Sequence, residues 1–176
     1  MWSFALFDGN SGELFLSRDR FGEKPLYYLK NENGIYFASQ TSFLKKIINK
    51  PLEINYTQLH RYLINGYKSL YKQESTYYKN VEELQPGTNM IIKPDLSSIN
   101  EKYWYPNYSP QKMSIGDAID GTKELMIKSL ELRLRSDVPL AFCLSGGVDS
   151  ASIASIARKY FNHDVKTFSI IDPNYK

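Results

Sequence analysis

Apolar and polar residues alternate along the first part of the chain, and this pattern predicts antiparallel β structure. Strand-like runs cover residues 2–7, 14–17, 25–29 and 35–39. Turn-forming residues separate these runs, and the last of the turns ends in Asn33-Gly34, a strong signal for a tight β-hairpin. We therefore expect antiparallel strands that lead into helical structure.

The hydrophobic period then changes from two to that of a helix. Two helical faces are predicted, and their apolar residues are Phe43, Leu44, Ile47 and Ile48 for the first, and Leu59, Tyr62 and Leu63 for the second. The second helix is expected to cover residues 56–65, with Gly66 at its end.

Residues 67–113 have the weakest periodicity in the chain. A turn at Pro86-Gly87 and a short strand through Ile92 are predicted there. Residues 102–112 are aromatic and contain proline, which is typical of a connector between domains. We place the domain division in this connector, and expect one domain over residues 1–105 and another over 106–176.

The second half begins with a predicted helix. Ser114 and Asp117 form a weak capping box, and the apolar face is made by Ile115, Ala118, Ile119, Thr122, Leu125, Met126, Ser129 and Leu130. An unbroken apolar run at residues 140–144 predicts a buried strand. A helix with Ile153, Ile156, Ala157 and Tyr160 on one face follows, and then a strand at 165–171. This order predicts two parallel strands joined by a helical crossover.

Composition places the chain among ordinary globular proteins. Apolar residues make up 42% and charged residues 23% of its 176 residues. The net charge of +3, without a basic cluster, gives little reason to expect a nucleic-acid partner. One cysteine excludes a disulfide framework, and the two histidines have no metal-ligand spacing.

Neither a membrane span nor a secretory leader is expected. No apolar run approaches the roughly 20 residues that cross a bilayer, and no basic segment precedes an apolar one at the start. A soluble, cytoplasmic protein is therefore predicted. Because both ends fall beside strand-like runs, we also expect the chain to be a fragment that spans parts of two domains.

The segment Ser145-Gly146-Gly147-Val148-Asp149-Ser150 lies between a predicted strand and a predicted helix. Ligands of parallel sheets bind beyond the carboxyl ends of the strands. Glycines let the backbone turn sharply and approach a ligand, and the N–H groups of a helix N-terminus attract anions. The two serines add hydroxyl groups. We expect a pyrophosphate-binding loop here.

Asp149 would repel a bare phosphate, so its predicted role is to bind a bridging Mg²⁺. The loop has no lysine, which argues against a Walker-type phosphate loop. The alternative for the same residues is a plain glycine turn with Asp149 as a helix cap.

The stretch LSGGVDSAS resembles the PP-loop of the ATP pyrophosphatases, in which a substrate is adenylylated and pyrophosphate leaves. The stretch FALFDGNSGELFLSRDRFGEKPLYY resembles the class II glutaminase domain of glutamine-hydrolysing asparagine synthetases. This second similarity continues through IYFAS, LQPGT and LELRLRSDVPLAFCLSGGVDSAS. The chain is similar to that family from residue 1 to about residue 171.

The resemblance implies a fold class: α+β, as part of an Ntn-type glutaminase sandwich, followed by the start of an α/β Rossmann-like PP-loop domain. It implies that Asp19 binds the α-amino group of glutamine, and that Arg18, Gly22 and Pro25 shape its loop. Around ATP and pyrophosphate it places Cys143, Leu144, Ser145, Gly146, Gly147, Asp149, Ser150, Ser169 and Ile170. Cys143 is then expected to be an apolar wall residue in a buried strand.

The chain also departs from the family. The family's glutaminase nucleophile is an N-terminal cysteine, whereas residue 2 is Trp, so no catalytic residue is assigned and no glutamine hydrolysis is expected from this polypeptide alone. Gln40 stands where the family usually has Glu. By resemblance, ATP, Mg²⁺, aspartate and glutamine are the implied small molecules, with a homodimer for the full-length parent.

The function implied is ATP-dependent asparagine synthesis through β-aspartyl-AMP, with ammonia from glutamine. Two alternatives stay open. One is a paralogous PP-loop amidotransferase with another acceptor, and the other is a truncated product without catalytic activity.

Overall fold

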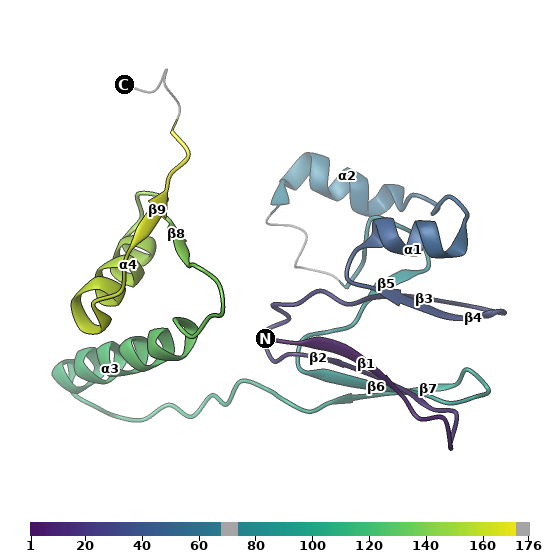
Figure 1. Cartoon of the computed structure of the whole chain (residues 1–176), viewed down its shortest axis with the longest axis horizontal. Coiled ribbons are helices and arrows are strands. Elements are labelled where there is room, and N and C mark those ends of the chain that lie inside the picture. Colours follow the sequence, from purple (N-terminus) through teal and green to yellow (C-terminus); the bar gives the residue numbers. More distant parts are fainter. Residues whose placement is uncertain (68–73, 172–176) are drawn as a thin grey trace. The chain divides into compact units, whose positions relative to one another are not determined.

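The computed structural model describes residues 1–67 and 74–171. The chain divides into two compact units, Met1–Tyr108 and Ser109–Lys176. The described residues contain both sheets and helices (Figure 1). The predicted mixture of α and β structure is therefore confirmed.

The first unit contains a four-stranded antiparallel sheet. Its strands are β1 (Ser3–Phe7), β2 (Leu14–Arg18), β6 (Thr88–Ile92) and β7 (Ser98–Lys102), in the spatial order β1-β2-β6-β7. The strand through Ile92 was predicted, and β7 was not. Since β2 pairs with β6, segments more than seventy residues apart in sequence form the centre of this sheet.

A three-stranded sheet lies beside the first. It consists of β3 (Tyr27–Asn31), β4 (Gly34–Ala38) and β5 (Val81–Glu83), in the order β4-β3-β5. Asn31 pairs with Gly34, so the predicted hairpin is confirmed. The segment between β2 and β3 crosses from one sheet to the other, and it carries Asp19.

The first unit is built in layers (Figure 1), and its buried apolar side chains form two cores. Side chains from both sheets form the first core, whose buried members are Leu16, Leu26, Tyr28, Leu84, Met90 and Ile92. The second core lies between the three-stranded sheet and helix α1 (Thr41–Ile48), and its buried members are Leu29, Leu44 and Val81. Tyr28 and Leu29 thus serve opposite faces of β3, as the alternation of a strand requires.

Helix α2 covers Tyr56–Asn65 and ends at Gly66, as predicted. The predicted apolar faces were partly wrong. In α1, Leu44 is buried but Phe43 and Ile47 are exposed. In α2 the buried residue is Gln58, because its amide oxygen accepts hydrogen bonds from Ser75 and Arg61. The buried residue of α2 is therefore a hydrogen-bonded polar side chain and not one of the predicted apolar residues.

The second unit contains α3 (Ile115–Arg133), β8 (Ala141–Cys143), α4 (Val148–Phe161) and β9 (Lys166–Phe168). β8 and β9 are parallel, as predicted. The expected capping by Ser114 at the start of α3 is confirmed, since its hydroxyl accepts the Asp117 N–H at 3.1 Å and donates to Asp117 Oδ2 at 2.7 Å.

The predicted burial was confirmed for Ala157 of α4 and was wrong for β8 and most of the α3 face. Ala141 and Cys143 of β8 are exposed, and α3 has no buried residue. The physical reason is that β8 and β9 form a sheet of only two strands, and within the described residues no layer covers its other face. The exposed apolar residues of α3 include Ile115, Ile119 and Leu125.

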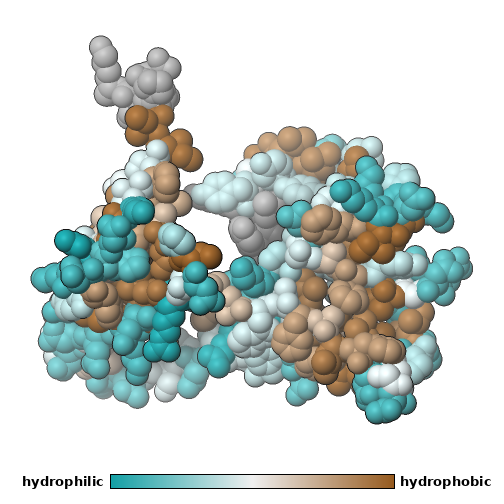
Figure 2. Space-filling view, in the orientation of Figure 1, coloured by the Kyte–Doolittle hydropathy of each residue, from teal (hydrophilic) through white to brown (hydrophobic). Residues whose placement is uncertain are grey.

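The outer strand of the first unit is apolar at the surface. Phe4, Leu6 and Phe7 of β1 are 45%, 62% and 66% exposed, and apolar residues gather over this part of the first unit in Figure 2. β1 pairs with β2 along one edge only among the described strands. Within residues 1–67 and 74–171, no helix is both long enough and apolar enough to cross a bilayer.

Candidate functional site

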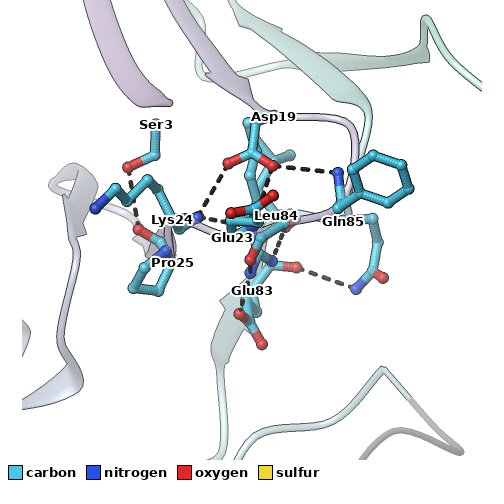
Figure 3. Close-up of polar contacts among 11 residues, drawn as sticks. Ser3, Asp19, Glu23, Lys24, Pro25, Glu83, Leu84 and Gln85 are labelled. Carbon is cyan, nitrogen blue, oxygen red and sulfur yellow. Dashed lines mark hydrogen bonds and ion pairs between the residues drawn. The ribbon is translucent and has the colours of Figure 1, made fainter. Parts of the chain in front are cut away.

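Asp19 lies at the end of β2 and its carboxylate points into the loop that follows (Figure 3). Only 4% of the residue is exposed. Oδ1 accepts the N–H groups of Phe21 and Glu23 at 3.1 and 3.0 Å. Oδ2 accepts those of Trp2 and Lys24 at 3.2 and 3.0 Å. Four backbone donors therefore surround one buried carboxylate.

The protonation of Asp19 follows from these contacts. Burial by itself raises the pKa of the Asp19 carboxyl, but the surrounding N–H groups stabilise the carboxylate and hold its pKa below the ordinary value of 3.8. The side chain is thus a fixed negative charge at neutral pH, with the chemistry needed to attract an ammonium group.

Arg18 holds the same loop from its carbonyl side. The side chain is 8% exposed and its Nε donates to the Lys24 carbonyl at 2.9 Å, while Nη2 donates to the Gly22 carbonyl at 2.8 Å. Nη1 donates to the Leu84 carbonyl at 2.6 Å, and Nη2 pairs with the Glu83 carboxylate at 2.8 Å. The loop-shaping role predicted for Arg18 is confirmed.

Arg18 and Asp19 are adjacent, carry opposite charges and bind different backbone groups of the same loop. Asp19 accepts hydrogen bonds from N–H groups of the loop, and Arg18 donates hydrogen bonds to carbonyl oxygens of the loop. Gly22 is required between them, because its φ of +64° is left-handed and a Cβ there would lie 2.9 Å from Pro86 Cγ. The position of Asp19 is therefore set by main-chain contacts.

The lowered pKa of Asp19 leads to a prediction about acid stability. A carboxyl whose pKa is lower in the folded state adds stability above its unfolded pKa, near 3.8, and loses it as the pH falls. We expect the free energy of unfolding to fall less steeply between pH 5 and pH 2.5 in Asp19→Asn than in the wild type. Urea unfolding at a series of pH values measures this difference.

The control for that experiment is Asp120→Asn, because Asp120 is exposed on α3 in the other unit. Its acid dependence for the unfolding of the first unit should match the wild type. Parallel curves for Asp19→Asn and the wild type would contradict the stabilisation of the Asp19 carboxylate by its four donors.

The second candidate site is the loop between β8 and α4. The Ser145 N–H donates to Ser150 Oγ at 3.3 Å, the two serine hydroxyls lie 3.2 Å apart, and Ser150 Oγ donates to the Gly147 carbonyl at 3.1 Å. Gly146 has a left-handed φ of +82°, which favours glycine. The loop is a closed turn held by its two serines.

The helix after this loop starts without a side-chain cap. Gly147 is the N-cap residue of α4 and no side chain accepts a hydrogen bond from the first turn. Asp149 is in that turn and is exposed. The alternative in which Asp149 caps the helix is therefore wrong. Such an N-terminus offers N–H groups to an anion, and Asp149 offers a carboxylate to a cation.

The strand ends bring the remaining predicted residues to the same edge. Cys143 is paired with Phe168, and the Leu144 N–H donates to the Phe168 carbonyl at 2.8 Å. Ser169 and Ile170 follow directly after this pair. Cys143 is exposed, so its predicted place in a buried wall was wrong for the described chain, for the reason given for β8.

Sequence reasoning did not identify the donors to Asp19. Trp2, Phe21, Glu23 and Lys24 act through their backbone N–H groups, which any residue except proline supplies, so no side-chain pattern marks them. No group of three or more potential metal ligands occurs within residues 1–67 and 74–171.

Comparisons with known families match both parts of the chain. The profile of the glutamine amidotransferase domain matches residues 1–104, and the profile of asparagine synthase matches residues 121–172. The first profile covers more than half of the chain, and the two matches follow one another in order.

Individual relatives are similar over almost all of the chain. A putative glutamine-hydrolysing asparagine synthetase of Methanocaldococcus jannaschii is 33% identical over 97% of this chain and 33% of its own length. Asparagine synthetase 1 of Bacillus subtilis is 31% identical over 97% of this chain and 26% of its own length. An amidase of Gibberella zeae is 30% identical over 94% of this chain and 24% of its own length. The chain thus spans a third or less of the length of these relatives.

Proposed function

Because the chain belongs to the family of glutamine-hydrolysing asparagine synthetases, we propose that its two units serve the two halves of an ATP-dependent amide synthesis. Ammonia is released from glutamine in one half, and a carboxylate is activated by ATP in the other. The observation that carries the proposal is the presence of both family matches in one chain, one after the other.

The proposed role of the first unit is to bind glutamine through Asp19. Its carboxylate remains charged at neutral pH and is held in place by four N–H groups, so its negative charge would attract an α-ammonium. The first unit is therefore proposed to contribute recognition of the glutamine α-ammonium.

The proposed role of the second unit is to bind ATP and its pyrophosphate. The uncapped start of α4 and the serines of the preceding loop support an anion site, and the exposed Asp149 would supply a carboxylate ligand to a Mg²⁺ ion. Mg²⁺ would supply charge neutralisation for departing pyrophosphate. Cys143, Ser169 and Ile170 at the strand ends would then flank the nucleoside.

The proposed reaction is asparagine synthesis. The side-chain carboxylate of aspartate attacks the α-phosphorus of ATP, pyrophosphate leaves, and ammonia displaces AMP from the resulting β-aspartyl-AMP. The relatives named as glutamine-hydrolysing asparagine synthetases support this choice of acceptor.

We predict that Asp149→Ala weakens the binding of Mg²⁺·ATP about tenfold or more, equivalent to about 1.4 kcal/mol. The reason is that the variant removes the carboxylate proposed to hold the cation while leaving the loop backbone intact. Titration calorimetry of the 176-residue chain with ATP in the presence of Mg²⁺ measures the change.

Asp164→Ala provides the matched control, since Asp164 is exposed and lies beyond the opposite end of α4. It should bind Mg²⁺·ATP as tightly as the wild type. Equal affinity of Asp149→Ala and the wild type would refute the metal-binding role, and equal losses in both variants would point to a general charge effect.

A second candidate acceptor has support from one comparison. The similarity to an amidase of Gibberella zeae is almost as high as that to the asparagine synthetases. A paralogous amidotransferase that uses another carboxylate is therefore the second proposal. Pyrophosphate release by the full-length protein, measured with aspartate and with a panel of other carboxylic acids, distinguishes the two.

A further inference from the structure

We propose that Tyr103 and Trp104 are positioning residues for Asp19, a role that rests on the proposed function of Asp19 in binding the α-ammonium of glutamine. They follow directly after β7 and begin the segment that leads along the chain to the second unit. Each of them packs against a residue whose backbone N–H donates to the Asp19 carboxylate.

Tyr103 holds the first of these donors. Its ring stacks on the ring of Trp2, with centroids 6.4 Å apart and an interplanar angle of 17°. The Trp2 N–H donates to Asp19 Oδ2 at 3.2 Å. The Tyr103 hydroxyl also donates to the carbonyl oxygen of Arg18 at 2.7 Å. Tyr103 therefore contacts the residue before Asp19 and a residue that donates to it.

Trp104 holds the second donor. Its ring meets the ring of Phe21 edge-on, with centroids 5.0 Å apart and an interplanar angle of 65°, which is a favourable aromatic geometry. The Phe21 N–H donates to Asp19 Oδ1 at 3.1 Å. Since Phe21 is 64% exposed, Trp104 is a main support for its orientation at the tip of the loop.

The main chain ties the same segments together. The Tyr103 N–H donates to the Gly87 carbonyl, the Gly87 N–H donates to the Asp19 carbonyl, and the Asp19 N–H donates to the Trp2 carbonyl, each at 2.9 Å. Gly87 has a left-handed φ of +66°, and a Cβ there would lie 3.0 Å from the Trp104 carbonyl oxygen. A glycine at this position therefore allows the close approach of Trp104.

Burial and charge agree with this placement. Tyr103 and Trp104 are half-buried, whereas Tyr105 and Tyr108 further along the segment are 65% and 89% exposed. Burial raises the pKa of the Tyr103 hydroxyl, and the negative charge of Asp19 raises it further. The segment is thus anchored at its first two residues, beside the carboxylate.

The test is a titration of the Asp19 carboxyl by ¹³C NMR in the full 176-residue chain. In Tyr103→Leu and Trp104→Leu we expect the Asp19 pKa to rise from its lowered value toward 3.8, because its Trp2 or Phe21 donor loses its support. Tyr105→Leu is the control, and its Asp19 pKa should match the wild type. An unchanged Asp19 pKa in both folded leucine variants would overturn the proposal.

Milder variants keep the test decisive if a leucine variant does not fold. Trp104→Phe retains an aromatic ring and should restore most of the lowered pKa. Tyr103→Phe keeps the stacking on Trp2 and removes only the hydroxyl that donates to Arg18. It should raise the Asp19 pKa by a smaller amount, and no rise in this variant, with Trp104→Leu unfolded, would also overturn the proposal.

A separate measurement keeps this inference distinct from the proposed function. Addition of L-glutamine should shift the Asp19 carboxyl signal in the wild type. In Asp19→Asn the amide at this position lacks the charge, and its signal should not shift. If L-glutamine causes no shift in the wild type, the proposed function of Asp19 fails. The dependence of the Asp19 pKa on Tyr103 and Trp104 is measured without glutamine, so that result stands or fails separately.

Discussion

Replacement of Arg18 by alanine is expected to destabilise the first unit by about 3–5 kcal/mol, the range for removal of one partner from a buried ionic network. The variant leaves the carbonyl oxygens of Gly22, Lys24 and Leu84 without their donor. It also leaves the Glu83 carboxylate without its cation. Because Arg18 is buried, solvent water does not readily replace its hydrogen bonds. The partner groups left unsatisfied therefore cost free energy.

Urea unfolding followed by tryptophan fluorescence measures this loss, since Trp2 and Trp104 both lie in the first unit. Arg20→Ala is the matched control, because Arg20 is two residues away and exposed. It should change the free energy of unfolding by less than about 0.5 kcal/mol. Arg18→Lys should recover only part of the loss, because an ammonium cannot reproduce the planar array of donors. A loss below about 1 kcal/mol in Arg18→Ala would refute the network as a source of stability.

Gly22→Ala is expected to give the second large effect. The left-handed backbone costs a non-glycine residue about 1–2 kcal/mol, and overpacking adds about 1–3 kcal/mol. The new Cβ would lie 2.9 Å from Pro86 Cγ and 3.0 Å from Arg18 Cζ. Both neighbours are constrained, since one is in a rigid ring and the other is in the hydrogen-bonded guanidinium group. The loop must shift, and Asp19 loses aligned donors.

Two measurements check the Gly22 prediction. The urea midpoint of unfolding should fall, and the pKa of the Asp19 carboxyl should rise toward its ordinary value because the loop amides move. Gly9→Ala is the control: no atom lies within 4 Å of the Cβ it would add, and its φ is not left-handed. Equal unfolding midpoints for Gly22→Ala and Gly9→Ala would show that the loop accommodates a side chain at position 22.

The local elements of the fold could be predicted from the sequence. The Asn33-Gly34 turn, the limits of α2 and the cap at Ser114 depend on a few neighbouring residues, so their patterns carry the information. The pairing of β2 with β6 does not, because it joins segments that are far apart in sequence. β5 and β7 are short and polar, and no hydrophobic alternation marked them.

Burial was harder to predict than secondary structure. An apolar face shows that a helix or strand can be covered, but it does not show that a covering layer is present. For this reason β8 and α3 carry core-like patterns, yet most of their apolar residues are exposed in the described chain. Gln58 is the opposite case, a polar residue that is buried because Ser75 and Arg61 satisfy it.

The sequence pointed to candidate side chains of the site, but it carried no signal for the main-chain contacts around them. Resemblance to a family pointed to Asp19 and to the loop at Ser145–Ser150, because their residue types are distinctive. The donors that surround Asp19 and the aromatic contacts of Tyr103 and Trp104 depend on the crossing of four distant segments. Only the three-dimensional structure brings these together.

Arg18 and Asp19 bind backbone atoms of the loop between them and β3, and this has a consequence for evolution. Contacts with backbone atoms do not depend on the side chains of the contacted residues. We therefore expect positions 23 and 24 to accept any residue except proline while the loop keeps its path. We expect the path of the loop to be more sensitive to replacement of Arg18, Asp19 or Gly22 than to replacement of residues 23 and 24. The surface around the site is left open to change, so that new specificities can arise without loss of its framework.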